Sequence, residues 1–173
     1  MNEIIDNIRT RRSCKSYCSD PLPGEIVDQI VEAGLFAASG GGMQTPIVLV
    51  AEKEARDRLS RLNAKYDPKK RTDPFYNAPV VLSVLVPKTE TIAVWDGSLV
   101  IGNMLLAAHS LGIGSCWIHR AKEVFDDEEG KQILKEAGVP GEYVGIAHCV
   151  IGYPEHENNR IIPRKENRVY RLR

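Results

Sequence analysis

Residues 96–118, DGSLVIGNMLLAAHSLGIGSCWI, decide the fold class of this chain. Residues 96–111 are apolar on nearly every side of a helix, which is typical of a helix buried at the centre of a domain. Gly112 ends the helical pattern, and residues 113–118 continue as a short apolar strand. A central helix followed at once by a buried strand predicts a domain in which helices and strands pack together.

The rest of the chain repeats the same two patterns. Apolar residues recur at helical spacing in several segments, whereas continuous apolar, β-branched runs predict buried strands. Asp126 and Gly138 are residue types that often begin and end a helix. This mixture favours an α+β or α/β sandwich in which helices cover a sheet, and it leaves the strand order open. The predicted helices are residues 3–9, 25–38, 54–64 and 126–137, and the other predicted strands are residues 47–51, 79–86, 143–152 and 169–172.

The composition is that of one ordinary globular domain. The chain has 173 residues, of which 43% are hydrophobic and 27% charged, a mixture that excludes a disordered, collagen-like or coiled-coil chain. We therefore expect a single domain over residues 1–173. The 23 lysines and arginines are balanced by 23 aspartates and glutamates. A net charge of zero argues against a nucleic-acid or membrane-surface partner, which would favour a basic excess.

The sequence also predicts where the protein resides. The most apolar run, residues 98–118, is interrupted by Gly102, Asn103, His109 and Gly112, so it differs from a membrane span of about 20 apolar residues. The start of the chain lacks the basic and apolar pattern of a secretory signal. The cysteines have irregular spacing and no Cys-x-x-Cys pair, which is typical of reduced cytosolic thiols. We therefore expect a cytoplasmic protein without a membrane span; its cysteines are Cys14, Cys18, Cys116 and Cys149.

Two short basic segments lie near opposite ends of the chain. Residues 11–15, RRSCK, place three cations and a hydroxyl next to one another, and residues 163–165, PRK, form a second cluster. Forked guanidinium donors, a hydroxyl and backbone N–H groups suit a phosphate dianion. Either segment could also be a solvated surface turn, which is the commoner role of a charge cluster. Together the two segments offer donors for one anion.

Two further segments could contact a ligand. Residues 39–42, SGGG, followed by Gln44, let a backbone approach a flat molecule closely. They match neither a P-loop nor a Rossmann fingerprint, and a flexible connection is the alternative. The strand after the central helix carries Trp117 and leads into His119 and Arg120, at a place where sites are often built. Trp117 could equally be packed in the core.

Other reaction classes have little support. The sequence lacks a Gly-x-Ser-x-Gly and a His-Glu-x-x-His motif, which argues against hydrolases and metalloenzymes. Cys14 has cationic neighbours but no histidine close in sequence to act as a base, so packing is its favoured role. We expect neither a metal site nor a catalytic acid or base.

The order of these segments resembles the nitroreductase family of FMN flavoproteins. The resemblance runs over residues 4–165, nearly the whole chain. It implies a single FMN-binding domain with an α+β fold, in which helices pack around a mostly antiparallel central sheet. It also implies a homodimer, and the strand-like tail at 169–172 could pair with the partner's sheet. The segments that carry the resemblance are 11–15, 39–44, LGIGSCWI at 111–118, Gly-Tyr-Pro at 152–154, and 163–165.

The resemblance also implies which residues bind FMN. The first basic segment would hold the phosphate and ribityl chain, its last residue would reach the flavin ring, and the second basic segment would complete the phosphate clamp. The loop after the third strand would lie against the flavin, and the Ser/Gly loop would approach from the partner chain. Many members have Asn at the position of Gly42, so here backbone groups would have to serve. The implied FMN-binding residues are Arg11, Arg12, Ser13, Lys15, Ser39, Gly40, Gly41, Gly42, Gln44, Trp117, Ile118, His119, Arg120, Arg164 and Lys165.

The function implied by the resemblance is that of an FMN-dependent oxidoreductase. A hydride would pass from NAD(P)H to flavin N5 and then to a nitroaromatic, a quinone or a related small acceptor, by a ping-pong mechanism. Lys15 is the residue that we expect to stabilise the negative charge of the reduced flavin. The alternatives are a flavin-binding sensor or carrier without significant reductase turnover, and a structural or partner-binding domain without flavin. Either NADH or NADPH could be the donor, and several classes of acceptor fit the resemblance.

Overall fold

The computed structural model describes residues 2–89, 92–156, 158 and 160–172. Its centre is a four-stranded sheet in the order β1-β2-β4-β3, and each neighbouring pair of strands is antiparallel. The predicted α+β fold with a mostly antiparallel sheet is therefore confirmed. The strands are β1 (Ile47–Glu52), β2 (Val80–Pro87), β3 (Gly114–Ile118) and β4 (Tyr143–Gly152).

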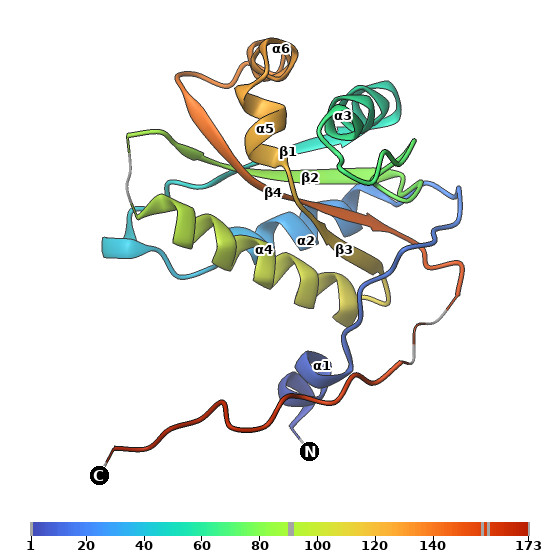
Figure 1. Ribbon diagram of the computed structural model, residues 1–173, viewed down its shortest axis with the longest axis vertical. Coiled ribbons are helices and arrows are strands. Elements are labelled where there is room, and N and C mark those ends of the chain that lie inside the picture. Colours follow the sequence, from blue (N-terminus) through green and yellow to red (C-terminus); the bar gives the residue numbers. More distant parts are fainter. Residues whose placement is uncertain (1, 90–91, 157, 159, 173) are drawn as a thin grey trace.

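Helices cover both faces of this sheet, as Figure 1 shows. One face carries α2 (Gly24–Leu35) and α4 (Ala93–Ser110), and the other carries α3 (Lys53–Lys65), α5 (Ala121–Asp126) and α6 (Glu128–Glu136). Because successive side chains of a strand point to opposite faces, the buried strands supply both layers. In β2, Val80, Leu82 and Val84 pack toward α2 and α4, whereas Val81 and Leu85 pack toward α3, α5 and α6.

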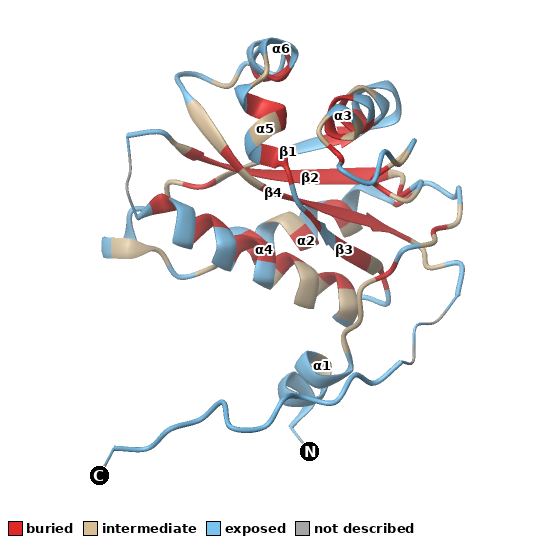
Figure 2. Ribbon diagram, viewed as in Figure 1, coloured by how far each residue is buried: buried red, intermediate tan, exposed pale blue. Residues whose placement is uncertain are grey.

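The central helix α4 lies very close to the sheet. A Cβ atom at Gly97 would lie 2.8 Å from Ile146 Cγ1 and 3.0 Å from Val86 Cγ1, so only glycine permits this approach. The predicted all-round burial of α4 is nevertheless incomplete, because Trp95 is 66% exposed and Leu99 is 50% exposed. Figure 2 shows the red, buried side of α4 facing the sheet and an exposed side facing outward.

Three helices, α2, α5 and α6, differ from the sequence predictions in ways that the structure explains. Helix α2 ends at Leu35, earlier than predicted, because the chain turns and becomes extended at Ser39. Helix α5 was not predicted, since its six residues are too few to establish a helical period. Helix α6 is capped by Asp127 rather than Asp126, because the Asp127 side chain accepts the N–H of Glu129.

Both ends of the chain extend from the body of the domain. Helix α1 (Glu3–Thr10) has no buried residue and is tied to α4 by Asn7 Nδ2, which donates to the carbonyl of Leu106 at 3.0 Å. The C-terminal arm passes α1 and continues away from the sheet (Figure 1). Residues 169–172 form no strand within the described chain, so the predicted strand is not confirmed in a single molecule. None of the described helices combines the length and the apolar character needed to cross a membrane.

Candidate functional site

The two basic segments line one cavity of about 570 Å³, which we call the basic cavity. It brings together residues from opposite ends of the chain. Its lining within the described residues includes four arginines and one lysine but no carboxylate, so the cavity attracts an anion. Lys165 is exposed and does not line it, whereas its neighbour Arg164 does. The lining residues are Arg11, Arg12, Ser13, Cys14, Lys15, Ser16, His156, Asn158, Arg160, Ile162 and Arg164.

Strand-like pairing fixes the first basic segment in place. Ser13 forms a parallel bridge with Ser115 of β3, and the N–H of Cys14 donates to the Ser115 carbonyl at 2.9 Å. Cys14 and Tyr17 are buried, and the Tyr17 hydroxyl donates to the Cys14 carbonyl at 2.9 Å. Lys15 points the other way and is exposed. Packing of Cys14 therefore anchors the segment, while its cations face the basic cavity.

Arg11 and Arg12 have different hydrogen-bonding states. Arg12 donates to the carbonyls of Arg160, Arg9 and Arg11 at 2.7–2.9 Å, so its guanidinium joins the end of α1 to the C-terminal arm. Arg11 Nη1 is buried and has no hydrogen-bond partner among the described residues. A buried donor without a partner costs free energy. Arg11 is therefore the donor that an anion in the basic cavity would satisfy.

Lys15 lies where the basic cavity meets a second cavity of about 470 Å³. Lys15 and Ser16 line both cavities. The Lys15 ammonium lies 5.8 Å from the centre of the Tyr76 ring and makes no ion pair within the described chain. The remaining lining of the second cavity is Tyr17, Arg71, Thr72, Asp73, Tyr76, Asn77 and Glu155.

The loop 67–77 is part of the site that sequence reasoning missed. The sequence analysis assigned these residues no helix, strand or ligand contact, because they have neither helical nor strand periodicity. In the structure it places Arg71, Asp73, Tyr76 and Asn77 against the second cavity. The one local indication was the density of Asp, Pro and Asn, which is typical of a structured turn.

The end of β3 divides its residues between two sides. The rings of Trp117 and His119 are exposed and stacked, with centroids 5.5 Å apart. Ile118 and Arg120 point into the interior, where Arg120 donates to Asn63 Oδ1 at 3.0 Å and lies 3.6 Å from Asp67. In this chain the side chains of Trp117 and His119 are accessible, whereas a contact from Ile118 or Arg120 would have to come from the backbone, and the flavin contact of residues 117–120 stays a prediction.

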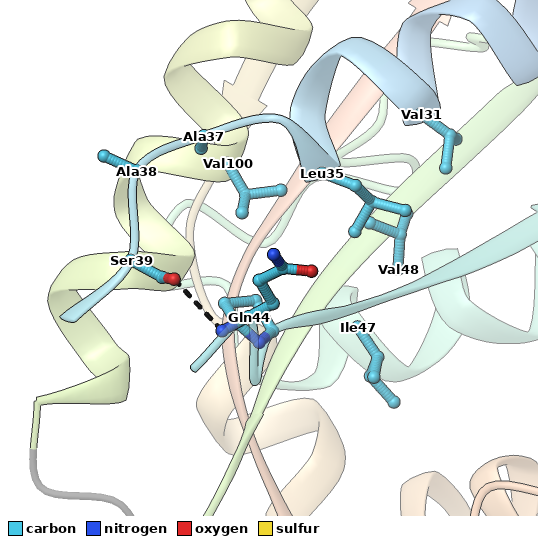
Figure 3. Close-up of a pocket in the computed structure, with 10 residues that line it drawn as sticks. Val31, Leu35, Ala37, Ala38, Ser39, Gln44, Ile47, Val48 and Val100 are labelled. Atoms are coloured by element: carbon cyan, nitrogen blue, oxygen red, sulfur yellow. Dashed lines mark hydrogen bonds between the residues drawn. The ribbon is translucent and has the colours of Figure 1, made fainter. Parts of the chain in front are cut away.

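The Ser/Gly loop is separate from the basic cavity within one chain. Ser39 Oγ accepts the N–H of Gln44 at 3.0 Å, and Gly40 donates to the Asp96 carboxylate. Ser39 and Gln44 line a mostly apolar cavity of about 330 Å³ between α2, α4 and β1, which shares no residue with the basic cavity. Figure 3 shows the Gln44 side chain extending into this cavity. Gly41 and Gly42 have φ angles of 59° and 69°.

The chain is similar in sequence and fold to known flavin-dependent proteins. A protein of Archaeoglobus fulgidus, provisionally named an NADH dehydrogenase/NAD(P)H nitroreductase, is 29% identical over 92% of this chain and 90% of its own length. The FMN reductase [NAD(P)H] of Bacillus subtilis is 26% identical over 89% of this chain and 67% of its own. A Bacteroides fragilis nitroreductase solved with bound FMN superposes with a TM-score of 0.87 at 27% identity, over the full length of both chains.

The family assignment rests on most of the chain. The sequence model of the nitroreductase family matches residues 8–153. This match begins in α1 and ends just after β4, so it includes the whole sheet and the first basic segment. The chain therefore belongs to the nitroreductase family.

Proposed function

We propose that this protein is an FMN-dependent NAD(P)H oxidoreductase. The observation that carries the proposal is the buried, unpartnered Nη1 of Arg11 in a basic cavity whose described lining holds no carboxylate. Such a donor set suits the phosphate of FMN, because arginine forks pair well with phosphate oxygens. The FMN-bound Bacteroides relative and the Bacillus FMN reductase support the same cofactor.

The two cavities would hold different parts of one FMN molecule. Arg11 and Arg164 would hold the phosphate from opposite ends of the chain, and Ser13 would contribute a hydroxyl. Lys15, at the junction with the second cavity, would place its charge near the pyrimidine edge of the flavin. When bound, FMN supplies the redox chemistry, taking a hydride from NAD(P)H and passing electrons to a small acceptor.

The contribution of Lys15 would be electrostatic. A fixed cation stabilises a reduced, anionic ring more than an oxidised, neutral one. Lys15 is exposed, so solvent reaches the cavity and can supply protons to the product. No protein side chain is therefore assigned as a proton donor. A nitroaromatic or quinone acceptor and alternating use of one site by donor and acceptor are part of this proposal.

We also propose that the working form is a homodimer with FMN at the interface. Large apolar side chains are exposed at Phe36, Met43, Trp95 and Leu99, and the Ser/Gly loop contacts α4 through the N–H of Gly40, which donates to Asp96. Strand β1 pairs only with β2 within the described chain, which leaves one edge open to a strand from another molecule. The arm residues Val169, Tyr170 and Leu172, which are at least 74% exposed, would pair with the partner. The four free cysteines support a cytoplasmic location.

One experiment tests the function. The purified protein should be yellow with a flavin spectrum, and anaerobic mixing with NADH or NADPH in a stopped-flow instrument should bleach it. Addition of a nitroaromatic or a quinone should then restore the colour. A protein that binds no flavin would overturn the proposal, and a flavin that neither nucleotide reduces would favour the sensor or carrier alternative.

A further inference from the structure

Tyr76 belongs to the loop 67–77 beside the second cavity. Two cations lie near its ring, Lys15 of the first basic segment and Arg71 of the same loop. Its ring centroid is 5.8 Å from Lys15 Nζ and 5.6 Å from Arg71 Cζ. The face of an aromatic ring attracts cations at this range. Arg71 Nη1 also donates to the Tyr76 hydroxyl at 2.8 Å, so the ring is held at its polar end as well.

A buried carboxylate holds Arg71 in turn. Arg71 Nε and Nη2 donate to the two oxygens of Asp67 at 2.6 and 3.1 Å, and the Asp67 side chain is fully buried. Hydrogen bonds from Arg71 hold the pKa of Asp67 well below its usual range, with help from the Lys69 N–H and the charge of Arg120. Asp67 therefore stays ionised at neutral pH. The contacts form a continuous series from Asp67 through Arg71 and Tyr76 to Lys15.

The backbone at Tyr76 is strained. Tyr76 and Asn77 have φ angles of 58° and 60°, a left-handed conformation that is unfavourable for residues other than glycine and more so for tyrosine than for asparagine. Asp73 maintains them, because its carboxylate accepts the N–H groups of Phe75 at 2.8 Å and of Asn77 at 2.7 Å. Strain of this kind persists where surrounding contacts impose it and is concentrated at functional sites. Here it directs the Tyr76 ring toward Lys15.

We propose that Tyr76 is a positioning residue for Lys15, and that it sets how strongly this protein stabilises reduced over oxidised FMN. The inference rests on the proposed function, since it takes Lys15 to lie at the flavin ring. Lysine has a long flexible stem, and Lys15 has no ion pair within the described chain. The Tyr76 ring is the group in contact with its ammonium. The loop thus selects the Lys15 conformers that place its charge at the cavity junction.

The test is a double-mutant cycle between Tyr76 and Lys15 with flavin affinity in both redox states as the readout. Tyr76→Leu removes the ring, and Tyr76→Phe keeps the ring but removes the hydrogen bond from Arg71. Each substitution is made twice, once in the protein with Lys15 unaltered and once in the Lys15→Met variant. We expect Tyr76→Leu to weaken the preference for reduced over oxidised FMN about two- to fivefold, the scale of an exposed cation–π contact. Tyr76→Phe should retain most of that preference. In the Lys15→Met background, Tyr76→Leu should have no further effect.

Each other result overturns the inference. An unchanged preference in Tyr76→Leu, or an equal loss in both backgrounds, would mean that Tyr76 does not act through Lys15. An unchanged preference in Lys15→Met alone would remove the premise that Lys15 acts on the ring, while FMN binding itself would stand. Failure of the unaltered protein to bind FMN would instead refute the proposed function. If Tyr76→Leu does not fold, Tyr76→Asn also removes the ring and suits the left-handed backbone better.

Discussion

Arg11 and Arg12 show at the scale of single residues how the fold separates equal side chains. Their guanidinium groups are identical, yet Arg12 donates to three carbonyls through Nε and Nη1, whereas Arg11 Nη1 has no partner within the described chain. Saturated donors hold the backbone, and unsatisfied donors bind ligands. Arg164 and Lys165 are both exposed, and they differ in that Arg164 lines the basic cavity and Lys165 does not.

Removing either Arg11 or Arg164 from the basic cavity should weaken cofactor binding. We expect Arg11→Ala and Arg164→Ala each to weaken FMN binding by about 1.5–3 kcal/mol, the scale of a hydrogen bond to a charged group. Fluorescence titration of the apoprotein with FMN measures this change. Lys165→Ala is the matched control and should bind FMN normally. Equal affinity in all three variants would contradict the phosphate clamp.

Gly42 offers a gain-of-affinity prediction at the same scale. Its φ angle is 69°, and no atom lies within 4 Å of a Cβ built there. Asparagine tolerates this conformation better than most residues, so Gly42→Asn should fold and could offer its amide to a flavin in the partner site. We expect FMN to bind more tightly by about 0.5–1.5 kcal/mol. Gly42→Ala, which adds a Cβ without the amide, should not bind more tightly.

At the scale of elements, the pairing of β2 with β4 buries a histidine. His148 of β4 is fully buried beside Phe75 and Phe125, and its Nδ1 lies 2.7 Å from Ser83 Oγ of β2. Burial, with a smaller effect from the charge of Arg120, lowers the pKa of His148 to about 3. The folded protein therefore keeps this imidazole neutral, consistent with a packing role.

This histidine should make the fold sensitive to mild acid. In the unfolded chain His148 takes up a proton below about pH 6.5, whereas in the folded chain it does so only near pH 3. Its contribution to stability is thus present above pH 6.5 and is lost as the pH falls, at up to about 1.4 kcal/mol per pH unit. Urea titrations between pH 7 and pH 4 should give a shallower pH dependence for His148→Gln. Parallel curves for the two proteins would show that His148 does not contribute.

At the scale of the whole molecule, the proposed FMN site would need a second chain to be complete. The Ser/Gly loop and the basic cavity share no lining residue, although the resemblance assigns both to one FMN. In the proposed homodimer a loop reaching across the interface would reconcile the two statements, and the exposed apolar side chains Phe36 and Met43 would belong to that interface. Light scattering should therefore give the mass of a dimer that retains FMN, and an FMN-bound monomer would contradict it.

Subunit mixing tests which chain supplies the loop. Arg11→Ala damages the basic cavity, and Gln44→Ala damages the loop. If the loop acts on the partner's cofactor, a mixed dimer of the two variants contains one site with both defects and one intact site. FMN binding should then recover in co-purified mixed dimers beyond either parent. If the loop acts within its own chain, no intact site forms and no recovery follows.

Local pattern was sufficient to predict much of this fold. We identified α4 and the buried strands because the spacing of apolar residues indicates helices and strands locally. We identified the basic segment at 11–15 because its cations are adjacent in sequence. Helix α5 was too short for such a pattern. The strand at 169–172 has the right composition but no pairing partner within the described chain, and a strand is defined by its neighbour.

The sequence by itself therefore determined most of the helices and strands and the kinds of donor available, whereas the tertiary structure decided which of them meet. Strand order, the meeting of Arg11 with Arg164 in one cavity, and the inward turn of Arg120 all depend on contacts between distant segments. The position of the Tyr76 ring depends on its hydrogen bond from Arg71, on the Asp67 carboxylate that holds Arg71, and on a left-handed backbone conformation. Residues far apart in sequence are brought together only when the sheet pairs and its two faces are covered, because that burial, and not local propensity, supplies most of the stabilising free energy.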